Sequence, residues 1–238
     1  MKTVSVVIPA KNEEETLGSV LDGISSDIAR LPEYIFEIIV VADHCTDGTE
    51  AVALEKNVRV ILNERNPGKG NALISGFGQI NGEIVIMLDS DGSHSSVDFG
   101  KMLSELDKGS HLVIGSRIKG GSDEYESWRL FGNALFTLMV NFLFCIELTD
   151  ALNGYKAMKA EVVSQYRHKS PGFEIEIELL YSTLIRGYKV SEVPSHELRR
   201  MGGKMKSNTL IDGARFLMAI LKWGLKYRIN KFLKRRLR

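Results

Sequence analysis

The chain has 238 residues, of which 44% are hydrophobic, enough to bury the core of one globular domain. Its two cysteines, Cys45 and Cys145, fit neither a disulfide framework nor a metal-binding spacing, which excludes a disulfide-rich secreted class and predicts a reducing cytosol. The net charge of +1 hides a division, because residues 213–238 carry nine basic residues and no acidic one. The remaining 1–212 hold 22 basic and 30 acidic residues, a net charge of −8, so we expect the basic tail to face an anionic partner.

The first part of the chain alternates short apolar runs with helix-like segments. Residues 3–9 are mostly apolar and β-branched and lead straight into acidic residues, so this run is too short for a signal peptide and predicts a first strand. Similar runs follow at 36–41, 58–62, 83–88, 111–114 and 188–194. Helix-like segments occupy 12–30, 47–56, 69–79 and 97–107. Because strands alternating with helices form parallel sheets, and continuous apolar runs fit strands buried on both faces, the sequence predicts an α/β fold.

Polar residues gather where the predicted strands end. In open α/β sheets, ligands bind at the carboxyl ends of the strands. Here those ends read Pro9-Ala10-Lys11-Asn12-Glu13, Ala42-Asp43-His44, Asn63-Glu64-Arg65, Asp89-Ser90-Asp91 and Gly115-Ser116-Arg117. The sequence therefore predicts a binding site at this edge of the sheet.

Two carboxylates, Asp89 and Asp91, follow the apolar run directly. Side chains two residues apart in an extended chain point to the same face, so both can meet one divalent cation. Mg²⁺ typically takes one or two carboxylates together with substrate phosphate oxygens. The alternative is an acidic turn with Gly92, because Asp and Gly are ordinary turn residues. Ser93 and His94 either add a ligand or lie in a solvated loop.

A glycine-rich segment places Gly68, Lys69 and Gly70 at a predicted helix start. Backbone N–H groups and a cation at such a position suit a phosphate, although the spacing is not that of a Walker loop and a plain turn is the alternative. Asp43 either accepts a hydrogen bond from a base or caps the following helix. Asp47 is the better candidate for the cap, which leaves Asp43 for a ligand.

The second part of the chain is more apolar. Residues 128–148 are interrupted by Gly132, Asn133 and Asn141, and a membrane-spanning helix needs about 20 mostly apolar residues, so a buried or interfacial helix is favoured over a span. Another helix is expected at 173–186. There Glu176 is one of three acidic residues that suit the start of a helix without any catalytic role.

A last helix is predicted in the basic tail. Its apolar residues recur at steps of three and four, bordered by Trp223 and Tyr227, and they are Leu210, Ala214, Leu217, Leu221, Leu225, Ile229 and Phe232. Aromatic and basic residues around an apolar stripe are typical of a helix that lies in a membrane interface. The alternative is a helix packed on the core with a solvated basic end. Nucleic acid is disfavoured as the partner, because the body of the chain is acidic.

Five segments occur in an order that resembles the family 2 inverting glycosyltransferases of the GT-A fold. They read VSVVIPAKNEEETL, VVADHCTDGT, NPGKGNAL, IVIMLDSDGSH and VIGSRIKGG, and the resemblance covers residues 3–206. It implies a Rossmann-like, mostly parallel GT-A sheet flanked by helices over 1–206, followed by an amphipathic basic helix over 207–238. Members of this family often read V-D-D-G-S after the second strand, where this chain has Ala42, His44 and Cys45 around Asp43.

The resemblance also implies a nucleotide-sugar site. In this family the first two motifs hold the base and ribose, the G-K-G lysine lies near the donor, and the D-x-D pair holds a metal on the diphosphate. The implied nucleotide-sugar-binding residues are Pro9, Ala10, Asn12, Glu13, Asp43, Lys69, Asp89, Ser90 and Asp91. Asp89 and Asp91 are the implied ligands of Mg²⁺ or Mn²⁺.

The second half resembles the polyprenyl- and dolichyl-phosphate sugar transferases. The segments that carry this resemblance are GSR at 115–117, DALNGYK at 150–156, EVP at 192–194 and RMGGKMK at 200–206, with Met205 where a serine is usual. The implied catalytic residues are Asp91, Arg117, Asp150, Arg200 and Lys206. Arg200 and Lys206 face the donor diphosphate or the acceptor phosphate in this interpretation, and a solvated basic loop is the alternative. Asp150 is either an acceptor-side acid or a turn residue.

These observations predict a metal-dependent, inverting hexosyltransferase, peripheral at the cytoplasmic face of the cell membrane. It takes a GDP-mannose or UDP-glucose type of donor and a polyprenyl or dolichyl phosphate acceptor. A phosphate acceptor is already anionic and needs no strong base, whereas a sugar hydroxyl would require Asp150 or Glu176 as the base. Two alternatives stay open: a family 2 enzyme with a sugar-hydroxyl or soluble acceptor, and a nucleotide-sugar-binding membrane adaptor without turnover.

Overall fold

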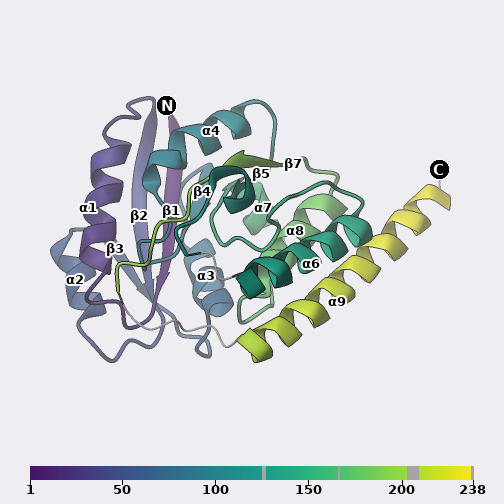
Figure 1. Cartoon of the computed structure of the whole chain (residues 1–238). Coiled ribbons are helices and arrows are strands. Elements are labelled where there is room, and N and C mark those ends of the chain that lie inside the picture. The colour runs from purple at the N-terminus through teal and green to yellow at the C-terminus, as the bar shows by residue number, and fades with distance from the viewer. Residues whose placement is uncertain (125–126, 166, 203–208, 237–238) are drawn as a thin grey trace.

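The computed structural model describes residues 1–124, 127–165, 167–202 and 209–236. Within them the strands form one sheet in the order β3-β2-β1-β4-β6-β5-β7 (Figure 1). Neighbouring strands are parallel except where β6 pairs with β4 and β5. The strands are β1 (Lys2–Ala10), β2 (Tyr34–Ala42), β3 (Arg59–Leu62), β4 (Ile84–Met87), β5 (Leu112–Ser116), β6 (Lys156–Lys159) and β7 (Val190–Pro194).

The helices cover both faces of this sheet (Figure 1). They are α1 (Leu17–Ile28), α2 (Thr49–Glu55), α3 (Lys69–Phe77), the 3₁₀ turn η1 (Ser96–Asp98), α4 (Phe99–Asp107), α5 (Arg117–Gly120), α6 (Ser127–Phe144), α7 (Ala160–Ser164), α8 (Ile175–Ile185) and α9 (Thr209–Arg236). Asp47 accepts a hydrogen bond from the N–H of Thr49 at 3.0 Å, so it caps α2 as the sequence predicts.

Alternate side chains of β1 enter two separate hydrophobic cores. Val6 and Ile8 pack with α1 and α4 on one face of the sheet, whereas Val7 packs with α3, α6, α8 and α9 on the other. Because successive side chains of a strand point to opposite faces, a strand between two cores must be apolar throughout. The continuous apolar runs of β1 and β4 follow from this placement.

The predicted α/β sheet is confirmed, and each of the six expected strands is present. β6 was not predicted from the sequence. It enters the sheet antiparallel and pairs Ala157 with both Ile86 of β4 and Val113 of β5. Its sequence KAMK begins and ends with lysines, Lys156 and Lys159, so it lacks the apolar run that marks the other strands. The carboxyl ends of β1, β2 and β4 still meet at one edge, as a parallel arrangement requires.

Helices α6 and α9 pack side by side (Figure 1), and α9 also contacts α8. One face of α9 is buried in this packing and carries Ala219, Ile220, Trp223 and Tyr227. From the sequence, Trp223 and Tyr227 were expected at the border of the apolar stripe, but in the structure both are buried in the core. The packed-helix alternative is therefore correct for this face.

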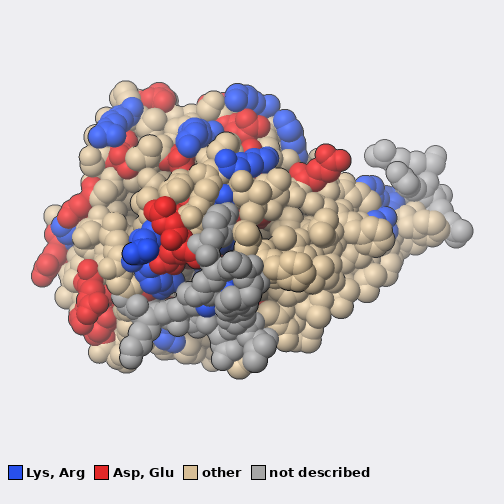
Figure 2. Space-filling model, in the orientation of Figure 1, with Lys and Arg blue, Asp and Glu red and all other residues tan. Residues whose placement is uncertain are grey.

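The opposite faces of both helices expose apolar side chains. We call these the apolar surface, which consists of Phe131, Leu135, Leu138 and Phe142 of α6 and Leu217, Met218, Leu221, Leu225, Ile229 and Phe232 of α9. Figure 2 shows few charged side chains over the region in which Figure 1 draws these helices. Among the described residues, no helix is both long and apolar enough to cross a bilayer.

Two basic side chains of the tail bind the ends of other helices. Arg228 donates to the carbonyl oxygens of Phe142 and Leu143 in the last turn of α6, and Lys234 donates to that of Ile185 at the end of α8. The last carbonyls of a helix have no partner within it and favour a nearby cation. Two of the basic side chains that we expected to face an anionic partner thus bind carbonyl groups of the protein itself.

Candidate functional site

A cavity of about 570 Å³ opens at the carboxyl edge of the sheet. Pro9, Ala10, Glu13 and Asp43 line one end, at the ends of β1 and β2. Lys69, Asp89, Ser90, Asp91, Glu176 and Arg200 line its middle. The other end is formed by Arg117 and by the first turns of α6 and α9, including Arg129 and Arg215. The cavity therefore connects the sheet edge with the two helices that carry the apolar surface.

Asp89 and Asp91 both line this cavity, but they lie in a turn and not on an extended strand. β4 ends at Met87, and Gly92 completes the turn with φ of +81°, a conformation that favours glycine. Ser93 fixes Asp91, because its hydroxyl and its N–H both donate to Asp91 Oδ1, at 2.6 and 2.9 Å. The carboxylates come together through the geometry of this turn, and the predicted i, i+2 placement on an extended strand is wrong.

Each of these carboxylates is paired with a cation of the protein. Lys69 Nζ lies 2.6 Å from Asp89 Oδ1, and an Arg200 guanidinium nitrogen lies 2.8 Å from Asp91 Oδ2. Burial is the largest single influence and acts to raise the pKa of Asp89, but the charge and hydrogen bond of Lys69, together with His94 and Arg200, lower that pKa to about 2. Asp89 is therefore ionised at neutral pH and suited to hold a cation.

His94 supports the turn from behind. The backbone N–H of Asp89 donates to His94 Nδ1 at 3.2 Å, so in the neutral ring the proton is on Nε2, which donates to Asn153 Oδ1 at 3.2 Å. The ring also stacks on Tyr155, with 4.9 Å between centroids. Since both ring nitrogens are engaged, His94 positions the Asp89 backbone and does not act as a metal ligand in this arrangement.

Asp43 accepts hydrogen bonds on both carboxylate oxygens. Asn63 Nδ2 donates to Oδ1 at 2.7 Å, and the N–H of Gly68 donates to Oδ2 at 2.9 Å. Each oxygen keeps a second lone pair, so the fixed carboxylate can still accept from a base N–H. Asn12, also predicted to bind the nucleotide, does not line the cavity and instead joins two loops through Thr46.

The glycines around Lys69 provide room for another loop of the chain. A Cβ on Gly70 would lie 2.1 Å from the carbonyl oxygen of Ser170, and the N–H of Asn71 donates to Pro171 O at 3.1 Å. Glu178, fully buried, fixes that loop by accepting from the N–H of Ser170 at 2.7 Å. This close backbone approach, together with the bond from Gly68 to Asp43, explains the glycines without a phosphate.

Gly70→Ala should destabilise the protein by about 1–3 kcal/mol, because the new methyl group collides with backbone that cannot move like a side chain. Urea denaturation measures this free energy of unfolding. Gly23→Ala is the matched control, since nothing lies within 4 Å of a Cβ on Gly23 in α1. That control should gain about 0.5–1 kcal/mol from helix propensity. Equal effects of both changes would contradict the close approach.

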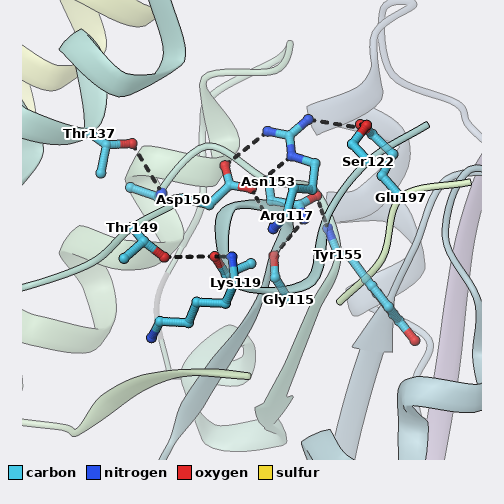
Figure 3. A network of polar contacts seen from close by, with 12 residues as sticks. Gly115, Arg117, Lys119, Ser122, Thr137, Thr149, Asp150, Asn153, Tyr155 and Glu197 are labelled. Atoms are coloured by element: carbon cyan, nitrogen blue, oxygen red, sulfur yellow. Dashed lines mark hydrogen bonds and ion pairs between the residues drawn. The ribbon is translucent and has the colours of Figure 1, made fainter. Parts of the chain in front are cut away.

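Arg117 and Asp150 form a bidentate ion pair (Figure 3). Arg117 Nε lies 2.7 Å from Asp150 Oδ2, and one terminal nitrogen donates to Oδ1 at 2.9 Å. The other terminal nitrogen donates to Glu197 at 3.2 Å. Arg117 lines the cavity, whereas Asp150 lies behind it and is not part of the lining. The structure therefore brings these two predicted residues together, with Asp150 as the group that positions Arg117.

A buried ion pair holds Lys69 from the other side. Lys156 is fully buried, and its Nζ lies 2.5 Å from Glu176 Oε2, while Lys69 Nζ lies 3.5 Å from Glu176 Oε1. Burial lowers the pKa of Lys156, and the charge of Glu176 opposes this shift. Removing one partner from such a pair leaves an uncompensated buried charge. Lys156, Glu176 and Lys69, with Asp89, form a row of four side chains of alternating charge that fixes Lys69.

A segment after β7, residues 195–202, lies across the carboxylate turn, and we call it the strap. The N–H of Leu198 donates to Ser93 O at 2.9 Å, and that of Met201 donates to Asp91 O at 3.0 Å. These bonds place Arg200 over Asp91. Lys206, the other predicted basic residue of this region, lies outside the described residues.

Asp89 and Asp91 are the two carboxylates whose fit to a divalent cation can be judged from the structure. Among the described residues, no group of three or more His, Cys, Asp or Glu side chains is arranged to hold a metal ion. Asp89 and Asp91 nevertheless fit Mg²⁺ or Mn²⁺ when phosphate oxygens of a substrate complete the coordination. The roles of Lys156 and Glu197 were not predicted from the sequence. Lys156 ends the DALNGYK segment and Glu197 lies outside the motifs, and both act through partners distant in the chain.

Comparisons with known proteins agree with this architecture. The sequence profile of glycosyl transferase family 2 matches residues 5–167. The chain is 32% identical over 244 residues to a dolichol-phosphate mannosyltransferase of Pyrococcus furiosus, covering 96% of this chain and 67% of that protein. It is 30% identical over 241 residues to a polyprenol monophosphomannose synthase of Mycolicibacterium smegmatis, covering 95% of this chain and 88% of that one.

A solved structure with a similar fold is glucosyl-3-phosphoglycerate synthase from Mycobacterium tuberculosis in complex with Mn²⁺, uridine diphosphate and glucosyl-3-phosphoglycerate. The TM-score is 0.71 at 26% identity, over 93% of this chain and 80% of that chain. This similarity confirms the predicted GT-A fold. The complex also shows that a protein of this fold binds Mn²⁺ together with a nucleoside diphosphate.

Proposed function

The chain belongs to glycosyl transferase family 2, and on this basis we propose that it transfers a hexose, with inversion, from a nucleotide sugar to a polyprenyl or dolichyl phosphate. The donor is of the GDP-mannose or UDP-glucose type. The names of the relatives from P. furiosus and M. smegmatis support a polyprenyl or dolichyl phosphate as the acceptor.

The observation that carries this proposal is the course of the cavity. It begins at Asp43, passes the Asp89 and Asp91 pair, and ends at the first turns of α6 and α9. A nucleotide sugar placed at the sheet edge would therefore point its sugar toward the two helices. A lipid phosphate reaching the cavity from their side would leave its apolar chain at the apolar surface.

Cationic groups surround the proposed position of the donor diphosphate. Lys69 and Arg200 line the middle of the cavity, where their charges would stabilise the negative charge that develops as the diphosphate departs. A divalent cation held by Asp89 and Asp91 would add Lewis-acid stabilisation of the same charge. Lys69 is held in position by Glu176, so its ammonium group is preorganised for this role.

Arginines line the acceptor end of the cavity. Arg117 is held by Asp150 and Glu197, and Arg129 and Arg215 belong to the first turns of α6 and α9. These cations would orient an anionic acceptor phosphate. One phosphate oxygen then forms a bond to the anomeric carbon as the bond from that carbon to the diphosphate breaks on the opposite face. Alignment of the reacting groups supplies most of the catalysis, and the in-line attack inverts the anomeric centre.

A sugar-hydroxyl acceptor is a less favourable alternative, because it needs a general base. Asp150 is engaged by Arg117 through both oxygens, and Glu176 is engaged by Lys156 and Lys69. An acceptor that is already a phosphate monoester needs no such base. The arrangement of these two acids therefore favours the lipid phosphate.

The proposed location is peripheral, at the inner face of the cell membrane. The apolar surface would lie in the membrane interface with basic residues of α9 around it, as in other amphipathic helices. Such basic side chains add about 1 kcal/mol each near an anionic leaflet. Lys222 and Lys226 would take this role, since both are exposed and directly follow Leu221 and Leu225 of the apolar surface in α9.

A donor screen tests the proposed function. The full chain is incubated with radiolabelled GDP-mannose, UDP-glucose or a related sugar nucleotide, with polyprenyl phosphate in detergent or vesicles, and with Mn²⁺ or Mg²⁺. We expect one donor to give a labelled lipid that partitions into organic solvent, and the label to vanish with EDTA or when polyprenol replaces polyprenyl phosphate. Transfer to polyprenol, or to a soluble sugar alone, would contradict the proposed acceptor.

A further inference from the structure

The carboxylate pair of the cavity is already neutralised by the protein. Asp89 and Asp91 carry two negative charges, and Lys69 and Arg200 return two positive charges at 2.6 and 2.8 Å. The neighbouring Lys156 and Glu176 neutralise each other in the same way. The group as a whole is close to electroneutral before any substrate enters.

Both cations lie beside the carboxylates and largely out of solvent, with 12% of the Lys69 and 23% of the Arg200 side chain exposed. Lys69 lies between Asp89 and Glu176. Arg200 belongs to the strap, whose backbone is bonded to Ser93 and Asp91, and its own N–H donates to Glu124 at 2.9 Å. A divalent cation at the carboxylates would therefore meet two positive side chains at close range.

The site also offers an incomplete set of metal ligands. Two carboxylates are present, and among the described residues no third acidic, histidine or cysteine side chain joins them in a metal-binding group. The diphosphate of a nucleotide sugar would correct both deficits at once. It adds two negative charges that balance the metal, and oxygens that complete its coordination.

We propose that Lys69 and Arg200 make divalent-metal binding conditional on the diphosphate, so that the protein takes the metal and the nucleotide together and binds either one poorly alone. This inference rests on the proposed function, whose donor supplies the diphosphate. When the diphosphate enters, Lys69 and Arg200 exchange their contacts with Asp89 and Asp91 for phosphate oxygens, which frees both carboxylates for the metal. The two cations then contact the leaving group whose charge they stabilise.

The test measures Mn²⁺ binding to the full-length protein, without acceptor or turnover. Free Mn²⁺ is quantified by electron paramagnetic resonance in the absence and presence of UDP or GDP, corrected for the Mn²⁺–nucleotide complex in solution. For the unmodified protein we expect one of the nucleotides to tighten Mn²⁺ binding by about 5- to 150-fold, the usual range of coupling between two ligands.

Arg200→Met should change the two affinities in opposite directions. Mn²⁺ alone should bind about tenfold more tightly, because a like charge next to the carboxylates is gone. The nucleotide should bind more weakly, so the coupling factor falls. Arg199→Met is the matched control, since it removes the same charge from an exposed neighbouring position on the strap and should leave both affinities unchanged. Lys69→Met is a second variant with the same expected signs.

Two results would overturn the inference. One is full-strength Mn²⁺ binding by the unmodified protein without nucleotide, and the other is unchanged Mn²⁺ affinity in both Arg200→Met and Lys69→Met when thermal denaturation shows them folded. Either result leaves the donor screen untouched, so sugar transfer to lipid phosphate without this coupling would reject the inference and keep the proposed function. Coupled binding of Mn²⁺ and nucleotide without sugar transfer to lipid phosphate would keep the inference and reject the proposed function.

Discussion

Replacing Asp91 with asparagine should lower the rate of transfer to polyprenyl phosphate about 100- to 1,000-fold, as expected when one group that stabilises transition-state charge is removed. Asparagine keeps the shape of the side chain and can still accept the two bonds that Ser93 donates to Oδ1. It loses the negative charge that pairs with Arg200 and that would hold the metal. Initial rates with saturating donor, at a series of Mn²⁺ concentrations, measure the effect.

The control is Asp22→Asn, which removes the same charge from α1, where Asp22 forms an exposed ion pair with Lys56 at the end of α2. Exposed ion pairs contribute little, so both rate and stability should stay near those of the unmodified protein. Thermal denaturation should show that Asp91→Asn is folded. If Asp91→Ala still transferred sugar to lipid phosphate with the metal chelated, the metal mechanism would be wrong. The adaptor alternative would be supported by a different result: neither the unmodified protein nor Asp91→Asn transfers sugar, and both bind the nucleotide equally well.

The location of this site was predictable from the sequence because local patterns determine it. The runs that became β1, β2 and β4 are mostly apolar, with Ser5 in β1 and Glu37 in β2 as interruptions, and each leads into a polar segment. Parallel pairing then brings Asp43 and Asp89 to the same edge, whatever the details of the loops. The reason given for the carboxylate geometry was wrong, since the pair lies in a turn closed by Gly92, and only the backbone of that turn shows it.

The contacts that fix the site were not predictable, because they join residues far apart in the sequence. Arg200 reaches Asp91 across more than a hundred residues, through the strap. Lys156 belongs to the DALNGYK segment, but the sequence does not indicate its burial, since a fully buried lysine depends on its partner Glu176 in another element. The two interpretations of Asp150, an acceptor acid or a turn residue, were both incomplete for the same reason, because its bidentate partner Arg117 comes from a different loop.

The tail illustrates a further limit of sequence patterns. Its apolar stripe was found from steps of three and four residues, but α9 has two apolar faces, and the pattern cannot tell which one packs on the protein. Trp223 and Ile220 are buried against α6 and α8, whereas Leu221 and Leu225 are exposed. Deleting the whole tail would therefore remove buried core residues as well as the exposed apolar ones. A loss of membrane binding after the deletion could then come from unfolding or from the loss of the apolar surface.

Substitutions confined to the exposed face avoid this ambiguity. In the triple variant Leu221→Gln, Leu225→Gln and Ile229→Gln, the changed side chains are 41–58% exposed, and glutamine is a good helix former. Full burial of such a side chain contributes about 1.5–3 kcal/mol, so the exposed half that a membrane would cover contributes about 1 kcal/mol each. Three changes then remove about 3 kcal/mol, which lowers the membrane partition coefficient about 100-fold. Co-sedimentation with vesicles of zwitterionic and anionic lipid measures it.

A matched control replaces three equally exposed apolar residues at the far end of the sheet, Ile35, Leu54 and Leu62, with glutamine. This control loses a similar exposed apolar area but should keep its vesicle binding, because these residues belong to β2, α2 and β3 and not to the apolar surface.

A sugar-transfer assay separates membrane docking from catalysis. The α9 variant should lose activity toward long-chain polyprenyl phosphate in vesicles and retain it toward a short, water-soluble isoprenyl phosphate, since the cavity is intact. Equal vesicle binding by the two triple variants would mean that the apolar surface has another partner. Loss of activity toward both acceptors would mean that the face supports the cavity itself.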